Sequence, residues 1–295
     1  MIVANGLGIA KTFQLSLLRI VGGGFAGRPG RSGGWLAVGW LAAMIAGATS
    51  ASSSAVWAVD VTPVKHEVPV PGLAPSFRVE TDLFEGTQVK PQSQHLLLFD
   101  SGVIYDLPIG VGTTITVFDP IRNRVMLLHK TQRVRTSIST ESLIQISAQV
   151  RSAAVEAGAE NSLGLNARVT PGELEGTYVI EFGDTKYTAT TQVPGNEGIA
   201  GEYAAFTVWA CRLNIARQVG SPPFARMTMA DFLASEKALP RQIRLDVKRG
   251  LKTRTYRAEH LYVGRLSDLD RKKISDVGQM IASFEEVDFS EFPAD

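Results

Sequence analysis

Short apolar segments follow one another between residues 76 and 138, with only a few turn residues between them. The first alternates apolar and charged side chains, which is typical of a strand with one buried face. The segments are residues 77–83, 94–99, 103–107, 113–118, 124–130 and 134–138. Residues 100–102 and 119–123, which join two of the pairs, are rich in residues that favour chain reversal. Because neighbours joined by such short turns run in opposite directions, this region predicts an antiparallel meander.

Four helices are predicted after the meander. The first begins at Ser139 or Thr140, whose hydroxyls can cap it, and apolar residues recur along it at helical spacing. The second covers residues 200–219 and is the most apolar of the four. The third and fourth begin at Thr228 and Ser267, each with an Asp three residues on as a capping-box partner.

Two further strand pairs lie among these helices. Residues 176–183 pair with 185–193, and residues 241–248 pair with 253–263, each across a short turn that contains glycine. Strands in runs with interspersed helices indicate an α+β fold rather than a parallel sheet. The sequence therefore predicts a curved, half-barrel-like antiparallel sheet that packs one face on three to four helices.

Residues 1–58 have the composition of an extended signal segment. They carry a charge of +4 with no acid, whereas the rest of the chain carries −3. A basic start precedes an uncharged apolar run of 14 residues, 35–48, and Ala58 follows Val56 at the spacing that a signal peptidase reads. An uncleaved membrane anchor is the alternative, but a span needs about 20 apolar residues. We therefore expect cleavage near Ala58 and export to the periplasm or cell envelope.

The rest of the chain divides into a linker and one domain. Residues 59–75 hold four prolines and predict an extended linker. Residues 76–295 show no further break and no internal repeat, which predicts a single α+β domain. Cys211 is the only cysteine, so the chain cannot form an intramolecular disulfide. The negative charge after the leader argues against a nucleic-acid binder.

The sequence contains no motif that is typical of catalysis or of metal binding. The four histidines are His66, His95, His129 and His260. No two of them have the i, i+4 spacing of a helical metal site. Cys211 lies in the apolar helix, where we expect it to be a buried and inert core residue. We therefore predict no catalytic residue, no metal site and no cofactor.

The most uneven charge lies between residues 241 and 273, which hold 11 bases and four acids. Candidate ligand-binding residues in its strand pair are Arg244, Lys248, Lys252 and Arg254. We expect the turn at residues 249–250 to bring Lys248 and Lys252 close together, as part of a basic patch for an anionic head group, glycan or partner. The alternative is an ordinary solvated face. The acidic tail, residues 285–295, carries −5 and is expected to lie near the pair.

An aromatic stripe lies on the apolar helix predicted over residues 200–219. Tyr203, Phe206 and Trp209 follow its spacing and are candidates for lining a ligand cavity. The alternative is that these three side chains belong to the packed core.

The order of the elements resembles a known class of carriers. Across about residues 76–263, the meander is followed by a helix and then by residues 240–245 (PRQIRL), which run through a hairpin to a late helix. This layout is similar to the half-barrel carriers of lipoproteins and hydrophobic ligands, the LolA/LolB-like class. Residues 117–120 (VFDP) and 222–226 (PPFAR) also resemble exported bacterial proteins of unknown function. The resemblance implies a cavity between a curved sheet and helices; extra segments around residues 160–240 depart from it, and no residue role is carried over.

Three functions are compatible with these patterns. The first is a non-enzymatic cell-envelope protein that binds an apolar or amphipathic ligand or a partner, such as a lipid, an anionic glycan or an envelope protein. It would touch a membrane only through the leader or peripherally. The second is a structural or interaction module with a filled core, and the third is an envelope hydrolase that uses carboxylates or Cys211. A carrier needs an apolar cavity with an open mouth, so the lining of the largest pocket separates these functions.

Overall fold

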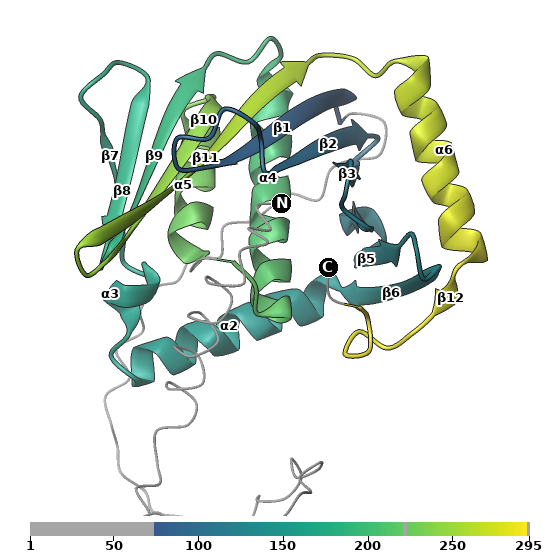
Figure 1. Cartoon of the computed structure of the whole chain (residues 1–295), viewed down its shortest axis with the longest axis horizontal. Helices are drawn as coiled ribbons and strands as arrows, with labels where there is room; N and C mark the ends of the chain where they lie inside the picture. Colours follow the sequence, from purple (N-terminus) through teal and green to yellow (C-terminus); the bar gives the residue numbers. More distant parts are fainter. Residues whose placement is uncertain (1–73, 221–222, 294–295) are drawn as a thin grey trace, which may run out of the picture.

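The structure is a computed structural model that describes residues 74–220 and 223–293 (Figure 1). The signal segment, the cleavage position after Ala58 and most of the linker lie outside the described residues. Export and processing therefore stay predictions.

The described residues form an α+β fold around one curved, unclosed and mostly antiparallel sheet of 12 strands. The strands are β1 (Phe77–Glu85), β2 (Ser93–Asp100), β3 (Val103–Ile109), β4 (Thr114–Asp119), β5 (Arg124–His129), β6 (Val134–Ser139), β7 (Val169–Pro171), β8 (Thr177–Phe182), β9 (Thr185–Gln192), β10 (Leu239–Arg249), β11 (Lys252–Val263) and β12 (Glu285–Glu286). Their order across the sheet is β12-β6-β5-β4-β3-β2-β1-β11-β10-β9-β8-β7. The predicted meander is confirmed as β1 to β6, and the two later pairs as β8–β9 and β10–β11.

Five α-helices accompany the sheet within the described residues. They are α2 (Thr140–Glu156), α3 (Glu160–Leu163), α4 (Glu197–Arg217), α5 (Phe224–Ser235) and α6 (Asp268–Ser283), and a short 3-10 helix, η1, covers Pro120–Arg122. None of the helices in the described part of the chain is long and apolar enough to cross a membrane.

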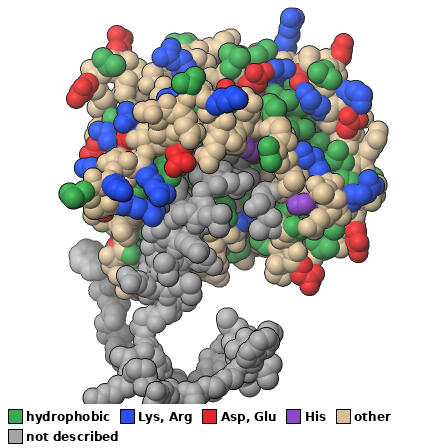
Figure 2. Space-filling view, in the orientation of Figure 1, with side chains coloured by type: hydrophobic (Ala, Val, Ile, Leu, Met, Phe, Trp, Pro, Cys, Tyr) green, Lys and Arg blue, Asp and Glu red, His purple; other side chains and the backbone are tan. Residues whose placement is uncertain are grey.

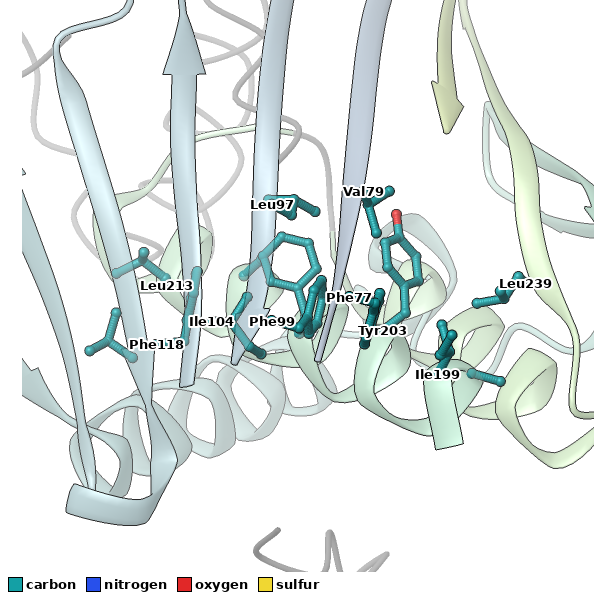
Figure 3. Close-up of a cluster of buried hydrophobic side chains, with 14 of the residues drawn as sticks. Phe77, Val79, Leu97, Phe99, Ile104, Phe118, Ile199, Tyr203, Leu213 and Leu239 are labelled. Carbon is teal, nitrogen blue, oxygen red and sulfur yellow. The ribbon is translucent and has the colours of Figure 1, made fainter. Parts of the chain in front are cut away.

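Helices α4 and α5 cover one face of the sheet, called here the inner face (Figure 1). Under α4, the rings of Phe77 and Phe99 stack with centroids 4.0 Å apart. The ring of Phe206 meets Phe99 and Phe118 edge-on at 6.0 and 5.5 Å. Figure 3 shows Phe77, Phe99 and Phe118 of this layer. Such ring geometry adds about 0.5–1.5 kcal/mol per pair beyond the burial of area.

Helix α6 covers the opposite, outer face of β2 to β5, so the predicted packing of one face only is wrong. Leu96 and Leu98 of β2 pack with Leu266 just before α6, and Val117 of β4 packs with Val277 within it. The strands show the reason: β2 and β5 contain continuous apolar runs, and every residue of β4 is buried, as expected for strands covered on both faces. No helix of the described residues packs on the outer face of β10 and β11, which carries charged residues such as Arg244 and Glu259.

The helix starts were predicted with mixed success. Ser139 caps α2, and Ser267 with Asp270 forms the expected capping box of α6. The start of α5 at Thr228 is wrong, because the helix begins at Phe224. The Thr228 hydroxyl instead donates to the carbonyl of Phe224 inside the helix, at 3.2 Å. A threonine hydroxyl can make its hydrogen bond in this way inside a helix, so a threonine alone does not indicate where a helix begins.

The expected position of the acidic tail is also wrong. Glu285–Glu286 forms β12, which pairs in parallel with β6 at one edge of the sheet, far in strand order from β10 and β11. Arg135 binds Glu286 at 2.8 Å. Phe289 and Phe292 pack against the inner core. Two partly buried rings and a backbone pairing fix the segment more firmly than attraction between exposed charges, which is weak in water.

Candidate functional site

The basic strand pair does not form the expected patch. Lys248 pairs with Thr253 and Arg249 with Lys252, and successive side chains along a strand alternate between the faces. Lys248 therefore projects from the outer face with Arg244, while Lys252 and Arg254 project from the other. Arg244 is also neutralised by Asp246, at 2.9 Å. Figure 2 shows Lys and Arg interspersed with Asp and Glu over the face that it presents.

The aromatic stripe is divided between two environments. Tyr203 and Phe206 are 5% and 3% exposed on the inner face. Trp209 is only partly buried at the edge of the same core, and the Arg212 guanidinium lies over its ring, 4.7 Å from the centroid. Tyr203 and Phe206 line a small hollow, described below, and Trp209 does not belong to that lining.

A cleft of about 640 Å³ lies on the inner face, at the end of the sheet where β1 turns into β2 and β3 into β4. Its floor is mostly apolar and comprises Leu83, Ile243, Leu245, Tyr256 and Ala258. The loop between β3 and β4 forms part of the rim, where Val111 is 97% exposed. This volume lies within the range of about 300–1,000 Å³ that is usual for small-molecule sites.

A histidine–aspartate pair stands in the wall of this cleft. His95 Nδ1 lies 2.7 Å from Asp106 Oδ1, and both residues are buried. The carboxylate fixes the orientation of the imidazole, and His95 itself lines the cleft. Sequence reasoning missed this pair. The signal was the hairpin turn at residues 100–102, whose register places residues 95 and 106 diagonally opposite on one face.

A smaller hollow of about 70 Å³, lined mostly by buried residues, lies between α4, α5 and the sheet. It is called here the inner hollow. Thr81 of β1 and His260 of β11 meet in its wall, with Thr81 Oγ1 2.9 Å from His260 Nδ1. Tyr203 Oη lies 3.3 Å from His260 Nε2. Polar residues from two neighbouring strands and from α4 therefore converge here.

Burial controls the charge states in the inner hollow. Burial, and then the nearby Arg226 guanidinium, lowers the pKa of His260 to about 3, so its imidazole is neutral at pH 7. Burial likewise raises the pKa of Tyr203. The pKa of the Cys211 thiol is raised to about 11, again chiefly by burial. Cys211 is 6% exposed, which confirms its predicted place in the core.

Arg226 is the charged residue of the inner hollow. It lies on α5, close to Tyr203, and is only 7% exposed. Sequence reasoning missed it, because the helix was predicted to begin at Thr228, which left Arg226 outside it. Among residues 74–220 and 223–293, no group of three or more His, Cys, Asp or Glu side chains is arranged to hold a metal ion.

Comparisons with known proteins add no family to this description. No model of a known protein family matches the chain, and no curated protein matches its sequence. Any function therefore has to be argued from the cleft and the inner hollow themselves.

Proposed function

We propose that this chain is an exported cell-envelope protein that binds an apolar or amphipathic ligand in the cleft and catalyses no reaction. The observation that carries the proposal is the cleft itself, with its apolar floor on the inner face. A structural module with a filled interior would not need such a space. The cleft has a volume of about 640 Å³ and a mostly apolar lining, and the release of water from that lining would supply the affinity.

The export part of the proposal rests on the sequence of residues 1–58. The apolar run is short and precedes a signal-peptidase spacing at Val56 and Ala58. Mass spectrometry of the protein purified from its native envelope should give a mature chain that begins near Val59. An intact segment 35–48 in that protein would contradict cleavage.

The ligand part of the proposal can be tested with a neutral, environment-sensitive dye such as N-phenyl-1-naphthylamine. The full chain should bind the dye saturably. Ser93 lines the cleft and is only half-buried, so S93W should fill the space without disturbing the core. We expect S93W to weaken dye binding at least about tenfold.

The matched control is S283W, on the exposed end of α6 on the other side of the sheet. It adds the same indole and should change the dye affinity less than twofold. Equal binding by the wild type and S93W would show that the dye does not use the cleft, and would overturn the proposal.

One observation favours a second candidate, an envelope hydrolase. The imidazole of His95 is oriented by a buried carboxylate in the wall of the cleft, as a general base would be. A hydrolase should cleave an apolar ester and lose that activity in H95Q while it keeps dye binding. Unchanged ester turnover in H95Q, or none in the wild type, would leave the binding protein as the better account.

A further inference from the structure

The inner hollow contains a positive charge that the described residues do not neutralise. Nη1 of Arg226 is buried and makes no hydrogen bond to any residue of 74–220 or 223–293. Within the same ranges Arg226 forms no ion pair with a carboxylate. A guanidinium keeps its charge inside a protein. A buried charge without a counter-charge is costly, so its presence calls for a partner.

Groups near Arg226 could also donate hydrogen bonds to a bound anion. Tyr203 lies beside the guanidinium, and its hydroxyl can donate. Asn214 lies on α4, as Tyr203 does, and its side-chain oxygen is buried without a hydrogen-bond partner in the described residues. Its amide group can turn so that its N–H groups point toward an anion. His260 is neutral and has no negative charge to offer. A water molecule could take up a hydrogen bond here, but it could not balance the charge.

The inner hollow and the cleft are neighbours. Leu245 lines both of them. Thr81, in the wall of the hollow, is paired across β1 and β2 with His95, in the wall of the cleft. A polar, positively charged hollow therefore adjoins a larger apolar cleft, and Leu245 belongs to the lining of both.

We propose that the inner hollow binds the oxyanion head of a single-chain amphiphile whose tail lies in the cleft, with Arg226 as the counter-charge. This inference rests on the proposed function and names the class of its ligand. The hollow of about 70 Å³ has room for one carboxylate or phosphate group, and the cleft of about 640 Å³ has room for an alkyl chain. The Leu245 side chain would move so that the inner hollow and the cleft connect.

The test compares head groups on one tail. Dodecanoate, dodecyl phosphate and dodecanol each compete with the neutral dye for the full-length wild-type protein. We expect both anions to displace the dye at concentrations at least about tenfold lower than dodecanol. The two anions then show which source of the oxyanion, a carboxylate or a phosphate, the hollow prefers.

Variants of Arg226 identify the residue responsible. R226M should weaken both anions at least about tenfold and leave dodecanol within twofold, while R226K should restore part of the difference. R271M is the matched control, because Arg271 is exposed on α6. It should leave all three affinities unchanged.

Each outcome decides something. Equal displacement by dodecanoate and dodecanol in the wild type would overturn the head-group assignment and leave the proposed function standing. A protein that binds neither the dye nor any of the three competitors would overturn both. If R226M does not fold, the comparison of head groups in the wild type and in R226K still decides.

Discussion

Strands β2 to β5 and strands β8 to β11 belong to one sheet, but they are covered differently. The first group lies between α4 on the inner face and α6 on the outer face. The second group has α5 on the inner face, and no helix of the described residues packs on its outer face. The difference is visible in single strands: every residue of β4 is buried, whereas only four of the 11 residues of β10 are.

The comparison teaches where each half can carry function. A strand covered on both faces contributes packing, and its side chains have little freedom to change. The inner face is different, because α4 and α5 leave a cleft and an inner hollow between themselves and the sheet. Both spaces lie near β1, where the two groups of strands meet, and they take residues from each.

The largest expected effect comes from a pair of leucines on the outer face. Leu98 of β2 lies under the α6 region and is fully buried, whereas Leu261 of β11 is 59% exposed. L98A should lower the free energy of unfolding by about 2–5 kcal/mol, because it leaves a cavity. L261A should change it by no more than about 0.5 kcal/mol. Urea denaturation measures both, and equal losses would mean that the two halves are not covered differently.

The next effect concerns the attachment of α6. The carboxylate of Asp270 is fully buried and accepts from the Ser267 N–H at 2.9 Å and from Arg78 Nη1 at 3.3 Å. Burial acts to raise the pKa of Asp270, but the Ser267 hydrogen bonds and the Arg78 guanidinium outweigh it and lower the pKa. D270A should cost about 2–3 kcal/mol of stability.

Hydrogen exchange can show that D270A destabilises β2 to β5 and not β8 to β11. In D270A the amides of β4 and β5 should exchange faster, while those of β9 and β10 should keep their protection. D268A is the control, since Asp268 lies exposed in the same helical turn. Because the pKa of Asp270 is lowered, its contribution should be present at neutral pH and disappear as the pH falls below about 4. Uniform loss of protection across the sheet would argue against separate covering.

The smallest effect is a pH dependence at the junction of the halves. His260 has a pKa near 3 in the folded protein and near 6.5 in the unfolded chain, so the unfolded chain binds the proton first as the pH falls. Stability should therefore decrease below pH 6.5, by roughly 1.4 kcal/mol per pH unit at most from this residue. By pH 5 that is about 2 kcal/mol. H260Q should show a flatter profile in denaturation between pH 7 and 5; an identical profile would mean that His260 is protonated in the folded protein.

The local structure was largely predictable from the sequence. The alternation along β1, the short turns of the meander and the capping box at Ser267 can each be recognised from residues that are close together in the sequence. The continuous apolar runs of β2 and β5 are typical of strands buried on both faces, so the second covered face could have been predicted from them.

Most of the candidate site could not be predicted from the sequence. The His95–Asp106 pair needed the register of one hairpin, which was available in principle. The inner hollow needed more, because Thr81 and Tyr203 lie 179 and 57 residues from His260 along the chain. Charge alone misplaced the tail, since Phe289 and Phe292 determine its position through packing. Contacts between distant segments depend on the whole fold, and no local pattern encodes them.

The two margins of the sheet have a consequence for how copies of this protein behave together. An open sheet of 12 strands ends in two rows of backbone donors and acceptors that could recruit a strand from another molecule. At one margin, β7 is three residues long and ends in Pro171, which has no N–H to offer. At the other, β12 is two residues long and consists of Glu285 and Glu286, both exposed, so that a second copy would meet like charge. Neither margin is therefore favourable for pairing with a strand of another molecule.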